Sequence, residues 1–335
     1  MRIAVVGAGA IGSLVAGYLS FKGEDIILIG RQGSVDKIKK NGLLISGVRG
    51  NLEIKLDTAE MLDFTPDLAI LATKTQDLSL AIRDNLKFLK AAACLTTQNG
   101  IHADNLLSEY IDRDKIISSI VMFGSTCTEP GKVVHNFEGS WIIGRLFDTG
   151  DNALVLKVKE TLEKIFPVIV SNDLKAMKLL KVFVNANNCL AAILGTSMQE
   201  TFSDLRISKI SICIWKEGLD IIRSLNLRLA SLPDFPLERI IKLTSMPMYE
   251  SAKIFSGIMV NLSREPLYGS ILQSIKRGRS SEIDYINGEF VNLAEANNLR
   301  APLNRKLVEM VHQVEDQKKF FTREELIEAT KELVN

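Results

Sequence analysis

The first half of the chain alternates short, continuously apolar runs with longer segments whose apolar residues recur at helical spacing. The apolar runs, rich in β-branched residues, lie at 3–6, 25–29, 68–71 and 93–97. The amphipathic segments between them lie at 13–21, 35–40 and 78–89. Continuous apolar runs are typical of strands covered on both faces, and their alternation with helices predicts βαβ units. A doubly wound parallel sheet is therefore expected.

Further β-type runs, separated by turn residues, continue this half of the chain. They lie at 43–46, 52–56, 116–123, 133–135 and 141–143. The last three are separated from one another by turns that contain Pro130-Gly131 and Gly139-Ser140, so we expect them to extend the sheet with antiparallel strands. A helix over 153–166 and a short strand at 167–170 complete the pattern.

Strand signals disappear after about Ser171, and only amphipathic segments follow. These lie at 173–195, 204–226, 237–262, 268–277, 281–298 and 303–318. The predicted fold class is α/β: an N-terminal Rossmann-type doubly wound sheet in 1–171, followed by an all-α domain in 172–335. Because no long Gly/Ser linker joins the two parts, we expect them to pack with a cleft between them.

Composition excludes several classes of partner. The chain has 335 residues, with 41 basic against 40 acidic side chains, so its charge favours neither nucleic acid nor an anionic membrane. The four cysteines lack C-x-x-C spacing and stand in apolar settings, which indicates reduced thiols in the cytoplasm. The three scattered histidines predict no metal site, and no signal peptide or membrane-spanning run is visible.

A glycine motif follows the first predicted strand and opens the first predicted helix. It reads Gly7-Ala8-Gly9-Ala10-Ile11-Gly12. In this context the first glycine allows a tight turn, the second lets a pyrophosphate approach the backbone, and the third lets the helix pack against the sheet. The free N–H groups of the helix start then favour phosphate. The alternative is a glycine-rich turn that binds no ligand.

Other candidate cofactor contacts follow the neighbouring strands. Where an NAD-selective fold has an acidic residue, this chain has Arg31, whose guanidinium suits a 2′-phosphate, so NADP(H) is the expected cofactor. Lys74 and Gln76 follow the strand at 68–71, and Asn99 follows the strand at 93–97. The alternatives are that Arg31 is a solvated loop charge and that Asn99 only forms a turn with Gly100.

The helical half carries polar residues in unusual settings. Lys181 and Asn185 share one helix face because they are four residues apart, although periodicity alone does not separate Lys181 from Lys178. Asn187 and Asn188 follow among apolar neighbours. Because asparagine disfavours a helix interior, these side chains either have a functional role or mark a break in the helix. Farther on, Ser281 is a plausible N-cap and Glu282 stands in the first turn, where an acid is favoured anyway.

Together these pieces resemble the ketopantoate reductase (2-dehydropantoate 2-reductase) family over nearly the whole chain. The matching features are the glycine motif, Arg31, Lys74, Gln98-Asn99-Gly100, Lys181-x-x-x-Asn185, and Ser270 twelve residues ahead of Glu282. The resemblance implies NADPH-dependent reduction of 2-dehydropantoate to (R)-pantoate, on the route to pantothenate and coenzyme A. The last motif, with its offset from Ser270, is the most specific.

The resemblance also implies a role for each matching residue. Lys181 would be the general acid, and Glu282 an acid near the substrate hydroxyl and the cofactor. Substrate contacts would come from Asn185, Ser270 and Asn99, the last of which would also touch the cofactor. The partner would be a small 2-oxo acid, bound by a monomer or a homodimer.

One departure from the family pattern bears on the substrate. The family usually has a second Asn four residues after the first, where this chain has Cys189, and Asn188 stands one residue early. An irregular helix would bring Asn188 inward; otherwise a substrate contact is lost. A reductase of a different 2-oxo or 3-hydroxy acid is therefore the alternative, followed by a non-catalytic NADP sensor, which would need neither Lys181 nor Glu282.

Overall fold

The computed structural model describes residues 1–147, 152–263 and 265–334, and it divides into two compact units, Met1–Lys175 and Ala176–Asn335. The strands of the first unit are β1 Arg2–Val6, β2 Asp25–Ile29, β3 Leu43–Gly47, β4 Leu52–Ile54, β5 Asp57–Ala59, β6 Leu68–Leu71, β7 Ala93–Thr96, β8 Ile116–Val121, β9 Gly124–Glu129, β10 Lys132–Phe137, β11 Trp141–Gly144 and β12 Val168–Val170. Its helices are α1 Ala10–Phe21, α2 Gln32–Asn41, α3 Thr75–Leu89, α4 His102–Ser108 and α5 Ala153–Leu162, with a 3₁₀ turn at Arg113–Lys115.

Eight strands form one sheet in the order β12-β11-β8-β7-β6-β1-β2-β5. From β1 the chain first adds β2 on one side and later β6 on the other, both parallel to β1. This reversal of strand order is a topological switch point, and ligands of such sheets bind outside the carboxyl ends of the strands there. The predicted doubly wound sheet is confirmed, and its switch point lies at the end of β1.

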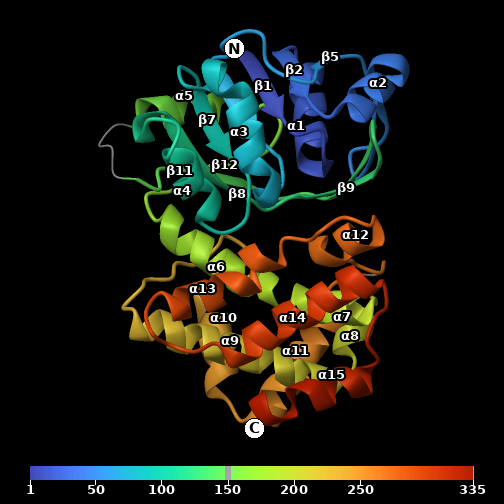
Figure 1. Cartoon of the computed structure of the whole chain (residues 1–335), viewed down its shortest axis with the longest axis vertical. Helices are drawn as coiled ribbons and strands as arrows, with labels where there is room; N and C mark the ends of the chain where they lie inside the picture. The colour runs from blue at the N-terminus through green and yellow to red at the C-terminus, as the bar shows by residue number, and fades with distance from the viewer. Residues whose placement is uncertain (148–151, 264, 335) are drawn as a thin grey trace. The chain divides into compact units, whose positions relative to one another are not determined.

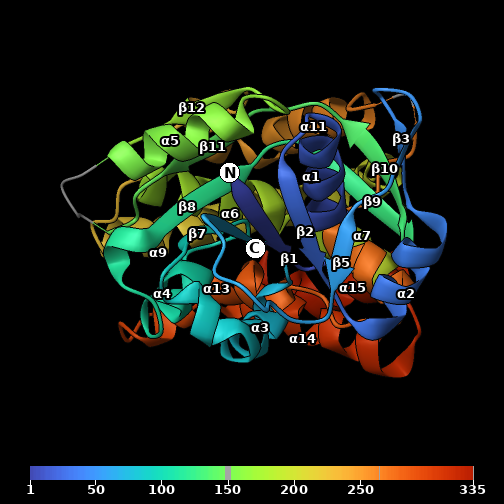
Figure 2. The same cartoon turned by 90° about the horizontal axis from the view of Figure 1, so that it is seen from above.

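The two faces of this sheet carry separate cores because successive strand residues point to opposite sides. In β1, Ile3 and Val5 belong to one cluster, together with side chains of α1 and α5. Ala4 and Val6 belong to the other, with side chains of α3 and α4. Figure 2 shows α1 and α5 on one side of the sheet and α3 and α4 on the other. The strand is fully enclosed, which explains its continuous apolar run.

The expectation that 133–135 would extend the main sheet is wrong. This run lies in β10, which pairs in parallel with β3 and antiparallel with β9. These strands form a separate four-stranded sheet of order β4-β3-β10-β9. Of the three runs, 116–123 joins the main sheet as β8, which is parallel to β7 and not antiparallel as expected, and 141–143 joins it as β11, antiparallel to β8. Strands β5 and β9 were not predicted, because each is short or polar and lies partly exposed.

The small sheet is tied to α1 by a buried histidine. The carbonyl of Phe137 can only accept, so Nε2–H of His135 donates to it at 3.0 Å. Nδ1 of the neutral ring then accepts from the Tyr18 hydroxyl at 2.9 Å. Burial is the main cause that lowers the pKa of His135, and the Arg49 charge adds to it.

This arrangement predicts acid sensitivity. Since the pKa of His135 is lower in the folded than in the unfolded state, its contribution to stability is present above the unfolded value and is lost as pH falls through the folded value. We expect His135→Gln to flatten the acid side of the pH dependence of Tm. The exposed His102→Gln variant is the control and should follow the wild type. If Tm of His135→Gln falls with decreasing pH as steeply as Tm of wild type, His135 is not a source of the acid sensitivity.

The second unit is helical, as expected (Figure 1). Its helices are α6 Leu174–Ala186, which begins in the first unit, α7 Asn188–Leu194, α8 Met198–Phe202, α9 Leu205–Ser224, α10 Leu237–Ser245, α11 Met248–Val260, α12 Ser270–Lys276, α13 Asn287–Glu295, α14 Pro302–Gln317 and α15 Arg323–Thr330. There are also 3₁₀ turns at Ile283–Tyr285 and Lys331–Leu333. The buried stripe of α9 contains Trp215, whose indole N–H donates to the carbonyl of Phe183 at 2.8 Å.

Three of the predicted long helices are interrupted. The segment 173–195 breaks at Asn187, and 237–262 breaks ahead of Pro247, which caps α11. The segment 281–298 opens as a 3₁₀ turn, and its α-helix begins only at Asn287. The α6–α7 stretch, Leu174–Leu194, is the one helical segment in 1–147, 152–263 and 265–334 apolar and long enough to cross a bilayer, and 78% of its most apolar window is buried inside the protein.

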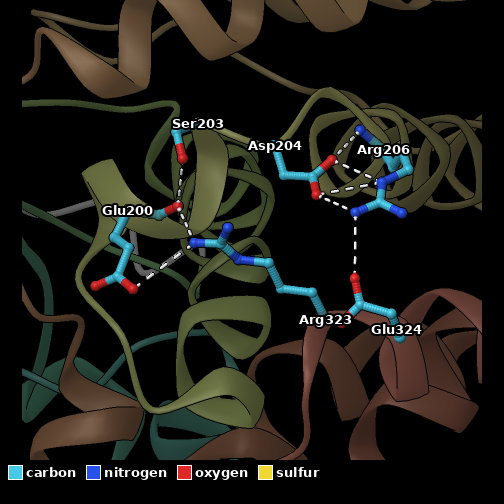
Figure 3. Close-up of polar contacts among 6 residues, drawn as sticks. All are labelled: Glu200, Ser203, Asp204, Arg206, Arg323 and Glu324. Carbon is cyan, nitrogen blue, oxygen red and sulfur yellow. Dashed lines mark hydrogen bonds and ion pairs between the residues drawn. The ribbon is translucent and has the colours of Figure 1, made fainter.

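Helix α15, which was not predicted, is attached by two arginines (Figure 3). Arg206 pairs with Asp204, the N-cap of α9, at 2.6 Å and reaches Glu324 on α15 at 3.5 Å. In the other direction, Arg323 of α15 donates to the carbonyl of Glu200 at 3.3 Å. These exposed pairs position α15 more than they stabilise it, since surface ion pairs contribute little.

Candidate functional site

The glycine motif forms the turn between β1 and α1, and two of its glycines are required by the protein itself. Gly7 has φ +121°, and a Cβ there would lie 2.6 Å from the backbone of Ala72 and Thr73. At Gly12 a Cβ would lie 1.9 Å from the Gly7 carbonyl oxygen. The turn and the close helix packing predicted for these two glycines are therefore present.

Gly9 is different, because nothing in the described residues requires it to be glycine. Its φ is −91°, and a Cβ there would meet no atom of residues 1–147, 152–263 or 265–334 within 4 Å. Along the described chain no side chain caps α1, and its first turn carries no acid. The backbone beside Gly9, with Ala8, Ala10 and Ile11 half-buried around it, thus leaves space and N–H groups for an anion. These residues fit the pyrophosphate of a dinucleotide.

Arg31 stands next to this turn. It follows β2 and is the N-cap residue of α2, and a Cβ on the preceding Gly30 would lie 2.7 Å from the Ala8 Cβ. The Arg31 side chain is 76% exposed, and its guanidinium pairs with Asp77, in the first turn of α3, at 3.0 Å. Arg31 is therefore held beside the glycine motif with donors left to face solvent or a ligand.

The ends of β6 and β7 are held together by Gln98, a residue that the sequence offered only as part of a family motif. Its Nε2 donates to the carbonyls of Leu71 at 3.0 Å and Thr73 at 2.7 Å, and its Oε1 accepts from the Thr97 N–H. The amide thereby fixes the loop that leads to Lys74, the N-cap residue of α3. Gln98 is 5% exposed, which makes it a support and not a ligand contact.

All predicted cofactor contacts outside the helical half meet at one edge of the sheet. β7, β6, β1 and β2 are consecutive neighbours, and their carboxyl ends lead to Asn99, Lys74, the glycine motif and Arg31. Gln76 follows in the first turn of α3 and is exposed, while Lys74 and Asn99 are half-buried. Glu282, also expected near the cofactor, belongs to the second unit.

The structure separates the two lysines that periodicity left equivalent. Lys178 is 1% exposed, and its positive charge opposes the rise that burial causes in the pKa of Glu289 on α13. Lys181 is half-buried on the same helix, and desolvation lowers its pKa to about 8. A lysine with this pKa exchanges a proton near neutral pH, as general acid–base catalysis requires. Lys178 has the character of a structural cation instead.

The asparagine cluster marks a break between two helices. Asn185 is half-buried in the last turn of α6. Asn187 lies at the break and is 2% exposed. Its side-chain amide lacks a hydrogen-bond partner in the described structure. Asn188 begins α7 and remains half-buried. A Cβ on Gly269 would lie 3.1 Å from the Asn188 Cβ and Cγ, so Asn188 lies against the residue that precedes Ser270.

Cys189 faces the interior of the helical unit. It is fully buried, burial raises the pKa of its thiol, and its side chain is hydrogen-bonded to that of Asn287. Asn287 in turn donates to the Asn304 side chain at 2.9 Å. The consecutive residues Asn188 and Cys189 thus contact α12 and α13 respectively. The polar side chain nearer to solvent at this break is that of Asn188.

The expectation that Glu282 stands in the first turn of a long helix is wrong, because Glu282 lies in an irregular loop. It is the half-buried N-cap residue of the 3₁₀ turn Ile283–Tyr285. The Ser281 hydroxyl accepts from the Ile283 N–H at 3.3 Å. Ser281 therefore caps a turn as predicted, but the turn is this short 3₁₀ turn and not a long helix. Ser270 is exposed at the start of α12. The substrate candidates therefore come from α6, α7, α12 and this loop, and Asn99 comes from the first unit.

Comparison with known proteins gives matches over both units. Residues 3–147 match the family model described as ketopantoate reductase PanE/ApbA, and residues 173–315 match the model of its C-terminal part. The chain is similar to the 2-dehydropantoate 2-reductase of Pyrococcus horikoshii, with 34% identity covering 91% of this chain and 94% of the relative. The corresponding protein of Pyrococcus abyssi is 31% identical over the same shares.

Among solved structures, the chain is similar to D-mandelate dehydrogenase in a ternary structure with NADH and anilino(oxo)acetate. The TM-score is 0.82 and the identity 26%, covering 95% of this chain and 99% of that one. A ketopantoate reductase of the same family from Ralstonia eutropha, at 23% identity and a TM-score of 0.79, shares the fold.

Proposed function

Since this chain belongs to the ketopantoate reductase family of oxidoreductases, we propose that it catalyses the NADPH-dependent reduction of 2-dehydropantoate to (R)-pantoate in the cytoplasm. The observation that carries the proposal is Lys181, a half-buried lysine whose pKa is lowered to about 8. Reduction of a ketone places negative charge on its oxygen, which needs a donor. The Lys181 ammonium stabilises that charge and donates the proton to it.

The sheet edge of the first unit would hold the cofactor. The backbone around Gly9 binds the pyrophosphate, Arg31 pairs with the 2′-phosphate, and Lys74, Gln76 and Asn99 add contacts from the adjoining strand ends. The bound nicotinamide supplies hydride, so the protein mainly has to orient the reactants. The dinucleotide named in the D-mandelate dehydrogenase structure is NADH, and Arg31 is the reason for proposing NADPH here.

The helical unit would hold the acid. Asn185, Asn188 and Ser270 bind the carboxylate and hydroxyl of the substrate through neutral hydrogen-bonding groups. Glu282 accepts a hydrogen bond from the substrate hydroxyl and orients it. Asn188 takes the place of the second family asparagine, because the break at Asn187 leaves it nearer to solvent while Cys189 is buried.

The test is oxidation of NADPH by the purified chain with 2-dehydropantoate, beside a panel of 2-oxo acids that includes phenylglyoxylate. Saturable turnover that is highest with 2-dehydropantoate supports the proposal. Turnover with another acid alone would overturn the substrate and leave the reaction class. No turnover with any acid, despite tight NADPH binding, would overturn the proposed function and with it the catalytic role of Lys181.

A second candidate is reduction of a different 2-oxo acid by the same residues. It is favoured by the likeness to D-mandelate dehydrogenase and by Cys189 at the position of the second family asparagine. Preference for the aromatic acid in the panel would support this candidate. Asn188→Ala distinguishes the two candidates further. The variant should raise KM for the acid that Asn188 binds and leave KM for the other acids nearly unchanged, so the acid whose KM rises identifies the substrate.

We expect Arg31→Asp to shift cofactor preference from NADPH toward NADH. The change removes a cation and adds a carboxylate that repels the 2′-phosphate. A charged hydrogen bond is worth about 1.5–3 kcal/mol, so the ratio of kcat/KM values should fall on the order of tenfold to a hundredfold. The control is Asp77→Asn, which frees Arg31 from its ion pair and should preserve the preference for NADPH. An unaltered ratio in Arg31→Asp would show that Arg31 does not bind the 2′-phosphate.

A further inference from the structure

The loop that carries Glu282 is attached to α14 on both sides of this residue. On one side the Ser281 N–H donates to Glu315 Oε1 at 2.7 Å. On the other side Asp284 Oδ1 lies 2.9 Å from His312 Nε2. His312 Nδ1 lies 3.3 Å from Glu315 Oε2, so one imidazole joins the two attachments. Nothing in the sequence pattern pointed to His312 or Glu315, because their importance comes from a loop distant along the chain.

The chemistry of this arrangement requires a particular state of the ring. A carboxylate can only accept hydrogen bonds, and a neutral imidazole has a single N–H. Both ring nitrogens of His312 face carboxylates, so both bonds exist together only when the ring is the imidazolium cation. Burial lowers the pKa of His312, but the hydrogen bonds and charges of Asp284 and Glu315 outweigh this and raise it overall.

The other charges near α14 act elsewhere. Glu217 of α9 accepts from the N–H groups of Leu303 and Asn304, at the opposite end of the helix, and Glu295 of α13 pairs with Arg305 there. Helix α7, which also packs on α14, contains no charged residue. Lys318 donates to the carbonyl of Glu315, not to its carboxylate. Among the described residues, Asp284 and Glu315 are the charged groups whose effect on the pKa of His312 is resolved.

We propose that His312, as the imidazolium, is a positioning residue that holds Glu282 in place: it binds Asp284, which follows Glu282 in the loop, and Glu315, which accepts from the N–H of Ser281 just before Glu282. The inference rests on the proposed function, because it is through Glu282 that the clamp affects turnover. Loss of the proton releases one carboxylate, and the loop from Ser281 to Tyr285 loosens. The enzyme consequently loses activity as pH rises through the titration of His312.

The clamp can be tested without activity by NMR of the full chain. The chain has three histidines, so His102→Gln and His135→Gln variants assign the ring signals. We expect His312 to titrate above the ordinary histidine value, and Asp284→Asn and Glu315→Gln each to lower its midpoint. The amide signals of Ser281 and Glu282 should move with the same midpoint, and this movement should vanish in His312→Gln. Amides that ignore the titration of His312, or a midpoint at or below the ordinary value, would overturn the clamp.

The activity arm compares pH profiles of kcat/KM for the 2-oxo acid. Since misplacement of a catalytic group by about 1 Å can cost 10²-fold, His312→Gln should lose at least tenfold at low pH and lack the limb due to His312. His312→Lys keeps a cation and should lack the limb due to His312, so that its activity falls only as Lys181 loses its proton near pH 8. Glu309→Gln, an exposed charge on the same helix, is the control and should match wild type.

The two arms fail separately. A His312→Gln profile that coincides with wild type would overturn the inference while the proposed function stands. Amides that follow His312 in a protein that reduces no 2-oxo acid would overturn the proposed function and leave the clamp.

Discussion

Replacement of Lys181 by methionine is expected to lower kcat by about 10²–10⁴-fold, the usual contribution of a general acid, with little change in the Kd for NADPH. Methionine fills the volume of the lysine stem but cannot donate a proton or balance charge on the ketone oxygen. Its effect should fall on kcat because the interaction strengthens as the oxygen becomes negative. Pre-steady-state turnover and NADPH titration by fluorescence measure the two quantities.

The same lysine predicts the pH dependence of the wild-type enzyme. Its pKa is lowered to about 8, and the protonated form is the acid, so the rate of reduction falls as pH rises through about 8. In Lys181→Met the limb due to Lys181 disappears from the profile, while the limb due to His312 remains. Oxidation of the product hydroxyl, which needs the unprotonated amine as base, should instead rise through the same pH.

Lys178→Met is the matched control, because Lys178 lies one turn away and is more deeply buried. Removing it leaves Glu289 buried without the positive charge that opposes its rise in pKa, so the variant should lose stability. Its kcat per folded molecule should stay within a few-fold of wild type. Turnover retained in Lys181→Met, or lost equally in both variants at full folding, would remove Lys181 from the role of acid.

The second large effect is expected at the glycine motif, from alanine at Gly12 and at Gly9. At Gly12 the new methyl would overlap the Gly7 carbonyl oxygen, which belongs to backbone fixed by β1. Overpacking of this kind costs about 1–3 kcal/mol or more, which corresponds to a fall in Tm of roughly 2–12 °C for a unit of this size. NADPH binding should be lost as well, since α1 is pushed away from the turn.

Gly9→Ala separates binding from folding. Its methyl meets no atom within 4 Å in the part of the chain that the structure describes, so Tm without cofactor should equal that of wild type. If the backbone at Gly9 contacts the pyrophosphate, the methyl occupies that space, and the Kd for NADPH should rise by at least tenfold. Differential scanning fluorimetry with and without NADPH measures both effects. Full cofactor-induced stabilisation of Gly9→Ala would exclude close approach of the ligand at this residue.

The sheet edge was predictable from sequence because its signals are local. A buried strand followed by glycines and a helix has one common geometry, and β6 and β7 read as strands from unbroken apolar runs. Parallel strands with buried faces place their carboxyl ends at one edge, so Arg31, Lys74 and Asn99 were expected near the glycine motif. The role of Gln98 was not foreseen, since two of its three bonds go to backbone carbonyls at and just beyond the end of β6, a segment distant along the chain.

The details of the helical unit depend on tertiary contacts. The apolar period of 173–195 continues through Asn187, so the break is visible only as an accumulation of asparagines. Whether Asn188 or Cys189 faces solvent depends on packing of α7 against Gly269 and Asn287. The burial that distinguishes Lys178 from Lys181 has the same origin. Strand β9 was missed because half-exposed polar residues carry little strand signal.

The enclosure of β1 between two different cores limits how the family can change in length. An insertion or deletion of one residue between Ile3 and Gly12 would have one of two effects. It would move Ile3 and Ala4 to the opposite faces of the sheet, or it would displace the glycines from the end of β1. The β3–β4 turn, from Val48 to Asn51, is exposed and contributes to neither core, although Arg49 joins it to Glu138 and to the carbonyl of Ile165. Variation in chain length among relatives should therefore accumulate at surface turns, while the distance from the first core residue to the third glycine is inherited unchanged.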